Sequence, residues 1–149
     1  MGARKEADDR LALMNLEARY AMTWDSGHAS DWAAVFTEDG TFEICQVGDR
    51  PRSVFTGREQ LARFCGEFTQ TTTGVHLPAL PYLEIDGDRA RGHVNFHFVA
   101  IGRLGPAHTV SRTATGHYEV DYERINGEWL IAHRLEKVLE SSRSEYFDY

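Results

Sequence analysis

The chain has few of the features that mark secreted or membrane proteins. It contains only two cysteines, Cys45 and Cys65, too few for a disulfide framework. Both lie in apolar patterns that are typical of small buried side chains. No apolar run has the length needed to cross a bilayer, and the polar first ten residues lack the pattern of a secretion signal. We therefore expect no membrane partner and a location in the cytoplasm.

The sequence also has fewer positively than negatively charged residues. Sixteen Lys and Arg residues against 23 Asp and Glu residues give a net charge of −7, and no basic stripe is present. A negatively charged protein repels phosphate backbones, so we expect no nucleic-acid partner. The sequence also lacks a phosphate-binding glycine loop, a dinucleotide fingerprint and a Gly-x-Ser-x-Gly nucleophile motif. These absences favour chemistry without a cofactor.

The composition that is present is that of an ordinary globular domain. A chain of 149 residues fits a single domain, residues 1–149, that can bury a core of its own. Hydrophobic residues make up 42% and charged residues 26% of the sequence. Three Trp, six Tyr and eight Phe residues supply flat apolar surface that suits a core or the wall of a pocket.

The first half of the sequence has a helical pattern. Apolar residues recur at helical spacing over residues 7–25, and Ser30 is a candidate N-cap for a short helix that runs to residue 36. Residues 38–40 are expected to form a turn before a strand over residues 41–47.

A third helix is expected after Thr56. Thr56 and Glu59 match a capping box, and the helix should end near residues 72–74. One face of this helix is apolar and carries Leu61, Phe64, Cys65 and Phe68.

The second half of the sequence has the alternation of strands. We expect strands over residues 75–85, 89–103, 109–124 and 129–139. Turn signals separate them, among which Asn126-Gly127 is a strong two-residue hairpin turn. The last residues, 141–149, are either a loose tail or a cover for the mouth of a pocket.

This order of elements predicts an α+β fold. Three helices in the N-terminal half precede a meander of long strands, an order typical of helices packed on one face of an antiparallel sheet. Strands of this length must curve, and a curved sheet closed by helices leaves a cavity. We therefore predict a cone-shaped, curved antiparallel β-sheet packed on the helices and enclosing an apolar pocket.

Several phrases, in their order and spacing, resemble the SnoaL-like branch of the nuclear transport factor 2-like superfamily. They cover most of the chain and lie at residues 19–25, 31–40, 55–61, 75–76, 116–118 and 124–131. The resemblance implies a cone with an internal pocket that binds a small hydrophobic molecule, and frequently a homodimer formed through the outer face of the sheet. The superfamily includes dehydratases, cyclases and isomerases that need no cofactor, and also noncatalytic modules.

Asp25 and His76 are the first candidates for catalysis. In the dehydratase and dehydrochlorinase relatives, an aspartate near the end of the first helix orients a histidine on the sheet, and the resemblance places Asp25 and His76 at those positions. Imidazole titrates near neutral pH and can remove a proton from carbon or oxygen, while a carboxylate fixes its tautomer. The alternative is that Asp25 only caps a helix end and His76 is an ordinary strand residue.

The match to scytalone dehydratase itself is incomplete. A rough alignment puts Ile44, Ala100 and Tyr118 where that enzyme has a tyrosine, a histidine and an asparagine. An electrophilic partner for the Asp–His pair must then come from elsewhere, and Tyr20, Tyr118 and Arg112 are the candidates; a tyrosine could donate a hydrogen bond to a developing oxyanion. Tyr118 could equally be a core aromatic residue.

The expected substrate contacts are mainly aromatic. They are Trp24, Phe42, Phe64, Phe96, Phe98 and Arg112. Strand alternation puts Arg112 on an apolar face, where it could bind a carboxylate on the substrate, pair with an internal acid or reach water at the strand end.

A metal site is not expected. His93 and His97 share a strand face, but four residues of strand separate them by about 13 Å, too far to chelate one ion. The remaining histidines have no ligand-like spacing.

Two functions remain open. The first is a cofactor-independent lyase or isomerase acting on a small, largely apolar ring compound, with His76 as general base. The second is a noncatalytic ligand-binding or assembly module built on the same cone.

Overall fold

The protein combines three helices with a single large sheet. The structure is a computed structural model that describes residues 2–46 and 51–147. Its helices are α1 (Gly2–Asp25), α2 (Ala29–Ala34) and α3 (Arg58–Thr71). Its strands are β1 (Phe36–Cys45), β2 (Ser53–Thr56), β3 (Thr72–Pro78), β4 (Tyr82–Asp86), β5 (Arg89–Gly105), β6 (His108–Ile125) and β7 (Glu128–Phe147). Among the described residues, no helix is both long and apolar enough to span a membrane.

The strands form one curved, open sheet. Their order is β2-β1-β7-β6-β5-β3, and β4 pairs with β5 beyond the end of β3. All pairs are antiparallel, as predicted, except β1 and β7, which run parallel and make the sheet mixed. The sequence did not predict this parallel pair, because β1 and β7 lie far apart in the sequence, and side-chain alternation carries no information on the direction of a partner strand.

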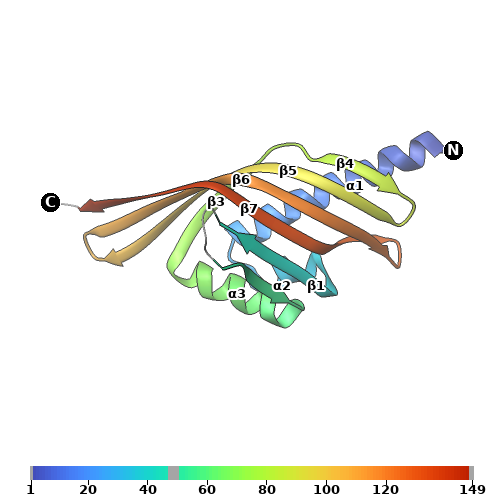
Figure 1. The fold of residues 1–149 in the computed structure, drawn as a ribbon. Helices are drawn as coiled ribbons and strands as arrows, with labels where there is room; N and C mark the ends of the chain where they lie inside the picture. The colour runs from blue at the N-terminus through green and yellow to red at the C-terminus, as the bar shows by residue number, and fades with distance from the viewer. Residues whose placement is uncertain (1, 47–50, 148–149) are drawn as a thin grey trace.

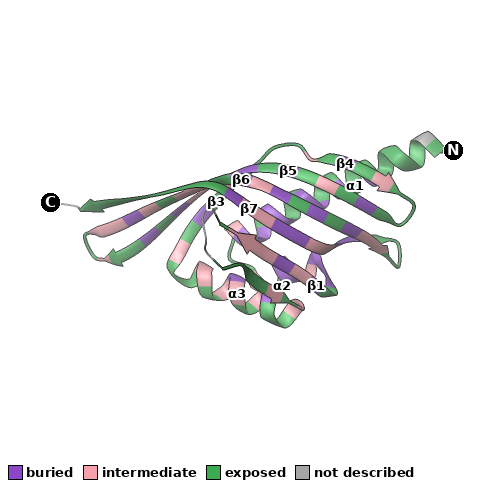
Figure 2. Cartoon of the chain, viewed as in Figure 1, coloured by how far each residue is buried: buried purple, intermediate pink, exposed green. Residues whose placement is uncertain are grey.

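The helices cover the concave face of this sheet (Figure 1). The core is rich in aromatic side chains from both layers and includes Tyr20, Trp32, Phe36, Phe42, Phe96 and Tyr118, all at most 4% exposed. Buried residues alternate with exposed ones along the central strands (Figure 2), the pattern of a sheet with one packed face. The predicted α+β cone is therefore present.

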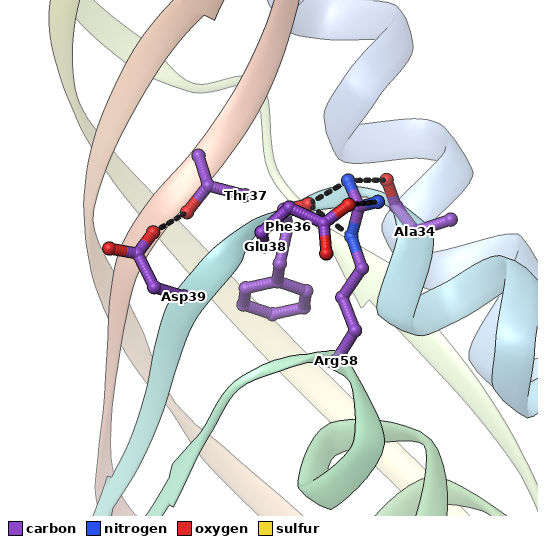
Figure 3. A network of polar contacts seen from close by, with 6 residues as sticks. All are labelled: Ala34, Phe36, Thr37, Glu38, Asp39 and Arg58. Carbon is purple, nitrogen blue, oxygen red and sulfur yellow. Dashed lines mark hydrogen bonds and ion pairs between the residues drawn. The ribbon is translucent and has the colours of Figure 1, made fainter.

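Arg58 at the start of α3 fixes the beginning of β1 (Figure 3). Its guanidinium donates to the Phe36 carbonyl from Nε at 3.0 Å and from Nη2 at 2.7 Å, and pairs with the Glu38 carboxylate at 2.6 Å. Residues 38–40 thus belong to an irregular part of β1 and not to the expected turn, and the pairing register with β7 shifts between Phe36 and Thr41. The expected end of this strand at Val47 lies outside the described residues.

Both predicted helix caps were wrong. Ser30 lies inside α2, whose N-cap is His28. The N-cap of α3 is Gly57, at φ 81°, and the backbone N–H of Thr56 donates instead to the Gln60 side chain at 3.0 Å. A β-strand, β2, precedes Gly57, so the positive φ of a glycine serves a sharp strand-to-helix turn. The first helix also begins earlier than expected, at Gly2.

The expected strand over residues 75–85 is in fact two strands. β3 ends at Pro78, and β4 begins at Tyr82 after Pro81. Proline has no N–H to donate to a ladder, which explains the break. Both pieces pair with β5, one after the other along its length.

The long hairpins agree with the sequence. β5 and β6 pair over almost their whole length, and Asn126 (φ 52°) and Gly127 (φ 83°) form the predicted tight turn. β7 is longer than expected, because residues 141–147 continue the strand and pair with the first half of β6. This end of the sheet projects beyond the helices (Figure 1), and the end of β7 within it is exposed throughout (Figure 2).

Candidate functional site

A cavity of about 500 Å³ lies between the concave face of the sheet and the helices. Its middle is apolar and mainly aromatic, with walls formed by Trp24, Phe42, Ile44, Phe64, Phe68, Phe96, Phe98, Ala100, Ala114 and Val138. Its polar lining residues are Tyr20, Gln46, His76, Arg112, Thr113, Tyr118, Glu136, Ser141, Ser142 and Arg143. A concave apolar site with a few converging polar groups is typical of a small-molecule site.

Asp25 and His76 are in direct contact. Asp25 is the last residue of α1, and His76 lies in β3 at the edge of the sheet. Oδ1 of Asp25 lies 2.6 Å from Nδ1 of His76, and Oδ2 accepts the backbone N–H of His76 at 2.9 Å. Because a carboxylate can only accept, the proton of the imidazole lies on Nδ1, and Nε2 is left as the basic nitrogen.

The imidazole of His76 is held by aromatic neighbours. Its ring packs against Phe98 with centroids 4.4 Å apart, and against the ring of Tyr20 edge-on at 6.0 Å. Trp24 approaches edge-on at 6.2 Å, and only 8% of the His76 side chain is exposed. The ring is therefore fixed in orientation at the cavity wall.

A buried ion pair lies behind the cavity. The guanidinium of Arg134 donates to both carboxylate oxygens of Glu17 at 2.8 and 3.0 Å, and Tyr122 donates to the same carboxylate at 2.7 Å. The guanidinium carbon lies 3.8 Å from the ring centroids of both Tyr20 and Tyr118. Burial opposes the charge of Arg134, but Glu17, Tyr20 and Tyr118 together outweigh it, and the pKa of Arg134 stays above its usual value. A permanent cation thus stands behind two tyrosines of the site.

The two tyrosines differ in access to the cavity. Burial raises the pKa of both well above the usual range, so both hydroxyls keep their protons. The Tyr118 hydroxyl is sealed inside the protein, and although Tyr20 and Glu136 are close enough to influence its pKa, neither meets hydrogen-bond geometry with it. Tyr20, whose ring contacts both His76 and Tyr118, is therefore the better placed donor.

Glu136 is the acid that the sequence analysis missed. It lies directly opposite Tyr118 in the β6–β7 ladder and lines the cavity. Burial raises the pKa of its carboxyl to about 7, although Arg134 and Tyr118 act in the opposite direction. A carboxyl of this kind can donate a proton near neutral pH. Strand alternation in the sequence could have identified it, because Glu136 alternates with Arg134 and Val138 on the inward face of β7.

The mouth of the cavity carries positive charge. Arg112, which the sequence placed on an apolar face, lies at the exposed end of that face and has no ion-pair partner among the described residues. Arg143 lies directly opposite it and pairs with Glu145 at 2.7 Å. The last residues were expected to be either a loose tail or a cover for the pocket mouth, and they supply Ser141, Ser142 and Arg143 to the cavity lining.

All of the sequence-derived site residues lie together. Every one of them lines the cavity except Asp25, which contacts it through His76. Within the parts of the chain that the structure describes, no cluster of three His, Cys, Asp or Glu side chains could hold a metal ion. Cys65 is fully buried, its pKa is raised to about 12 by burial, and it takes no part in the site. Cys45 is only partly buried.

The fold and the site together define a cone-shaped protein with a mainly apolar cavity that opens at one end, and an Asp–His pair in its wall. A family model described as the SnoaL-like domain matches residues 5–135, and the chain belongs to this family. No curated protein sequence matches the chain.

Solved structures have the same fold. A protein of unknown function from Mycobacterium tuberculosis is 27% identical with a TM-score of 0.76, over 91% of this chain and 75% of that one. A hexachlorocyclohexane dehydrochlorinase is 16% identical with a TM-score of 0.77, over 93% and 90% of the two chains. An NTF2-like protein with a cystatin-like fold from Novosphingobium aromaticivorans is 22% identical with a TM-score of 0.71, over 93% and 87%.

Proposed function

We propose that this protein is a cofactor-independent lyase or isomerase that acts on a small hydrophobic ring compound. The observation that carries the proposal is the 2.6 Å contact between Asp25 and His76 at the wall of an apolar cavity. The likeness in fold to a dehydrochlorinase, an enzyme named for an elimination reaction, is consistent with it. Similarity of fold alone does not specify a reaction, so the proposal rests on the geometry of the site.

In this mechanism His76 is the general base. Its Nε2 takes a proton from a ring carbon of the substrate, and Asp25 stabilises the imidazolium that forms. The electrons of the broken C–H bond form a double bond as the leaving group departs from the neighbouring carbon. In an isomerase, the same proton returns at another carbon.

Two further groups complete the proposed reaction. Tyr20 keeps its proton and donates a hydrogen bond to an oxygen on which charge develops. Glu136 is protonated below about pH 7 and gives its proton to a leaving hydroxide, which departs as water. The aromatic walls exclude water and strengthen these interactions.

The test uses nitrobenzisoxazole, a neutral compound whose ring C–H proton can be removed by a base in an apolar pocket. In nitrobenzisoxazole, removal of the ring C–H proton breaks the N–O bond and releases a coloured cyanophenolate. We expect His76→Ala and His76→Gln to lower kcat/KM for this reaction by about 10²-fold or more while circular dichroism stays native. His97→Ala, a histidine on the outer face of β5, is the matched control and should keep the wild-type rate.

Equal rates for wild-type and His76→Ala would overturn the proposed mechanism. The noncatalytic binding module would then be the better account of the same cavity.

A further inference from the structure

Two arginines lie opposite each other at the mouth of the cavity, and this arrangement does not stabilise the protein. Arg112 in β6 and Arg143 in β7 are directly opposite each other in the antiparallel ladder, and both line the cavity. Like charges placed opposite one another destabilise a sheet. Arg143 is compensated by Glu145, but Arg112 has no carboxylate partner among the described residues.

Ser141 shares the cavity face with the two arginines, one row away from them. Thr113 and Ser142, which hydrogen-bond to each other at 2.5 Å, alternate onto the opposite face of the sheet. Glu145 is held on its other oxygen by His108 at 2.8 Å, so it is fixed beside Arg143 and does not reach across to Arg112 in this structure. A guanidinium that has no carboxylate partner within the protein is a binding group for a planar oxyanion.

The pairing register places these arginines relative to the catalytic pair. His76 pairs with Phe98, Phe98 with Ala114, and Ala114 with Ser141, which makes one row across the sheet. Arg112 and Arg143 form the next row on the same face, about 7 Å further along the strands. Tyr118 and Glu136 lie on the opposite side of the His76 row, deeper in the cone.

We propose that the substrate is an aromatic or alicyclic carboxylic acid, with its ring in the apolar middle of the cavity and its carboxylate bound by Arg112, assisted by Arg143. That this acid is a substrate rests on the proposed function. Its binding in the cavity does not depend on catalysis. The acid group would fix the ring so that a carbon about one strand step from the carboxylate faces His76.

The experiment measures binding directly by isothermal titration calorimetry. The probes are naphthylacetate and its uncharged amide, naphthylacetamide, which have the same ring and nearly the same shape. We expect the wild-type protein to bind the acid about fivefold more tightly than the amide, and this preference to fall as salt is raised. Arg112→Gln should remove most of the preference, and Arg112→Gln with Arg143→Gln should bring it to one, with amide affinity unchanged.

Arg103→Gln is the matched control. Arg103 lies on the same projecting hairpin, is exposed and does not line the cavity, so its loss should leave the preference intact. Naphthylmethylphosphonate and naphthalenesulfonate test which anion the site prefers. Tighter binding of either compound than of naphthylacetate would contradict the proposal that the site binds a carboxylate.

Three results would overturn the inference: no binding of any probe, equal binding of acid and amide by the wild type, or a preference that survives loss of both arginines. Each of these is separate from the outcome of the nitrobenzisoxazole test, because that reagent is neutral and needs no arginine.

Discussion

Glu17 and Arg134 form a two-point ion pair in the interior, between α1 and β7, with their side chains only 5% and 1% exposed. The pair joins the helical layer to the sheet directly behind the cavity, and Arg134 also packs on the ring of Tyr20. Removal of one partner would leave an uncompensated charge in a medium that cannot solvate it.

We therefore expect Glu17→Gln to lower the free energy of unfolding by about 3 to 5 kcal/mol, measured by urea denaturation. Glu6→Gln removes a carboxylate from an exposed ion pair with Arg10 on the same helix and should cost less than about 1 kcal/mol. Similar costs for the two variants would mean that the buried pair does not stabilise the fold as described.

Asp25 acts on the reaction only through His76 in the proposed mechanism. Asp25→Asn should lower kcat/KM for nitrobenzisoxazole by at least about tenfold, because the amide no longer stabilises the imidazolium. Asp25→Asn combined with His76→Ala should be no slower than His76→Ala alone, since residues that act as a unit are not additive.

Asp31→Asn removes an exposed carboxylate in the neighbouring helix α2 and is the control for this series. If Asp25→Asn slowed His76→Ala further, Asp25 would have a role of its own in the reaction.

The raised pKa of Glu136 makes stability depend on pH in a defined direction. Its carboxyl has a pKa of about 7 in the folded protein against 4.5 ordinarily, so between these values the folded state holds a proton that the unfolded state has lost. Stability should therefore fall as pH rises from about 4.5 to about 7, by on the order of 3 kcal/mol for this group. Above that range both states are ionised and this contribution no longer changes.

Glu136→Gln should remove this pH-dependent component, measured as the free energy of unfolding in urea at several pH values. Glu140→Gln, an exposed position on the same strand, should retain it. A pH dependence that is identical in Glu136→Gln and the wild type would contradict a proton held at Glu136 in the native state.

Much of the site could be predicted from the order of the residues. The aromatic positions Trp24, Phe64 and Phe98 follow helical or strand periodicity, and periodicity fixes which face of an element is buried. The Asn126-Gly127 turn predicts the last hairpin, and alternation along β6 predicts the inward direction of Tyr118.

Other features were not predictable in this way. The parallel pairing of β1 with β7 depends on how two distant segments meet, and no local pattern records it. Glu136 and Arg143 look like ordinary charged residues of a strand until the curvature of the sheet brings them to a cavity. They become candidate site residues only because they line the cavity, and the rest of the cavity wall is formed by other helices and strands.

The sequence by itself determined the three helices, the long strands β5, β6 and β7, their buried faces, and the presence of an acid at a helix end and a histidine on a strand, because these follow from short-range periodicity and composition. Only the tertiary structure decided that Asp25 touches His76, that Glu136 holds a proton near neutral pH, and that Arg112 stands opposite Arg143. Those properties arise from distances and burial between residues far apart in the chain, and electrostatic interactions depend on both.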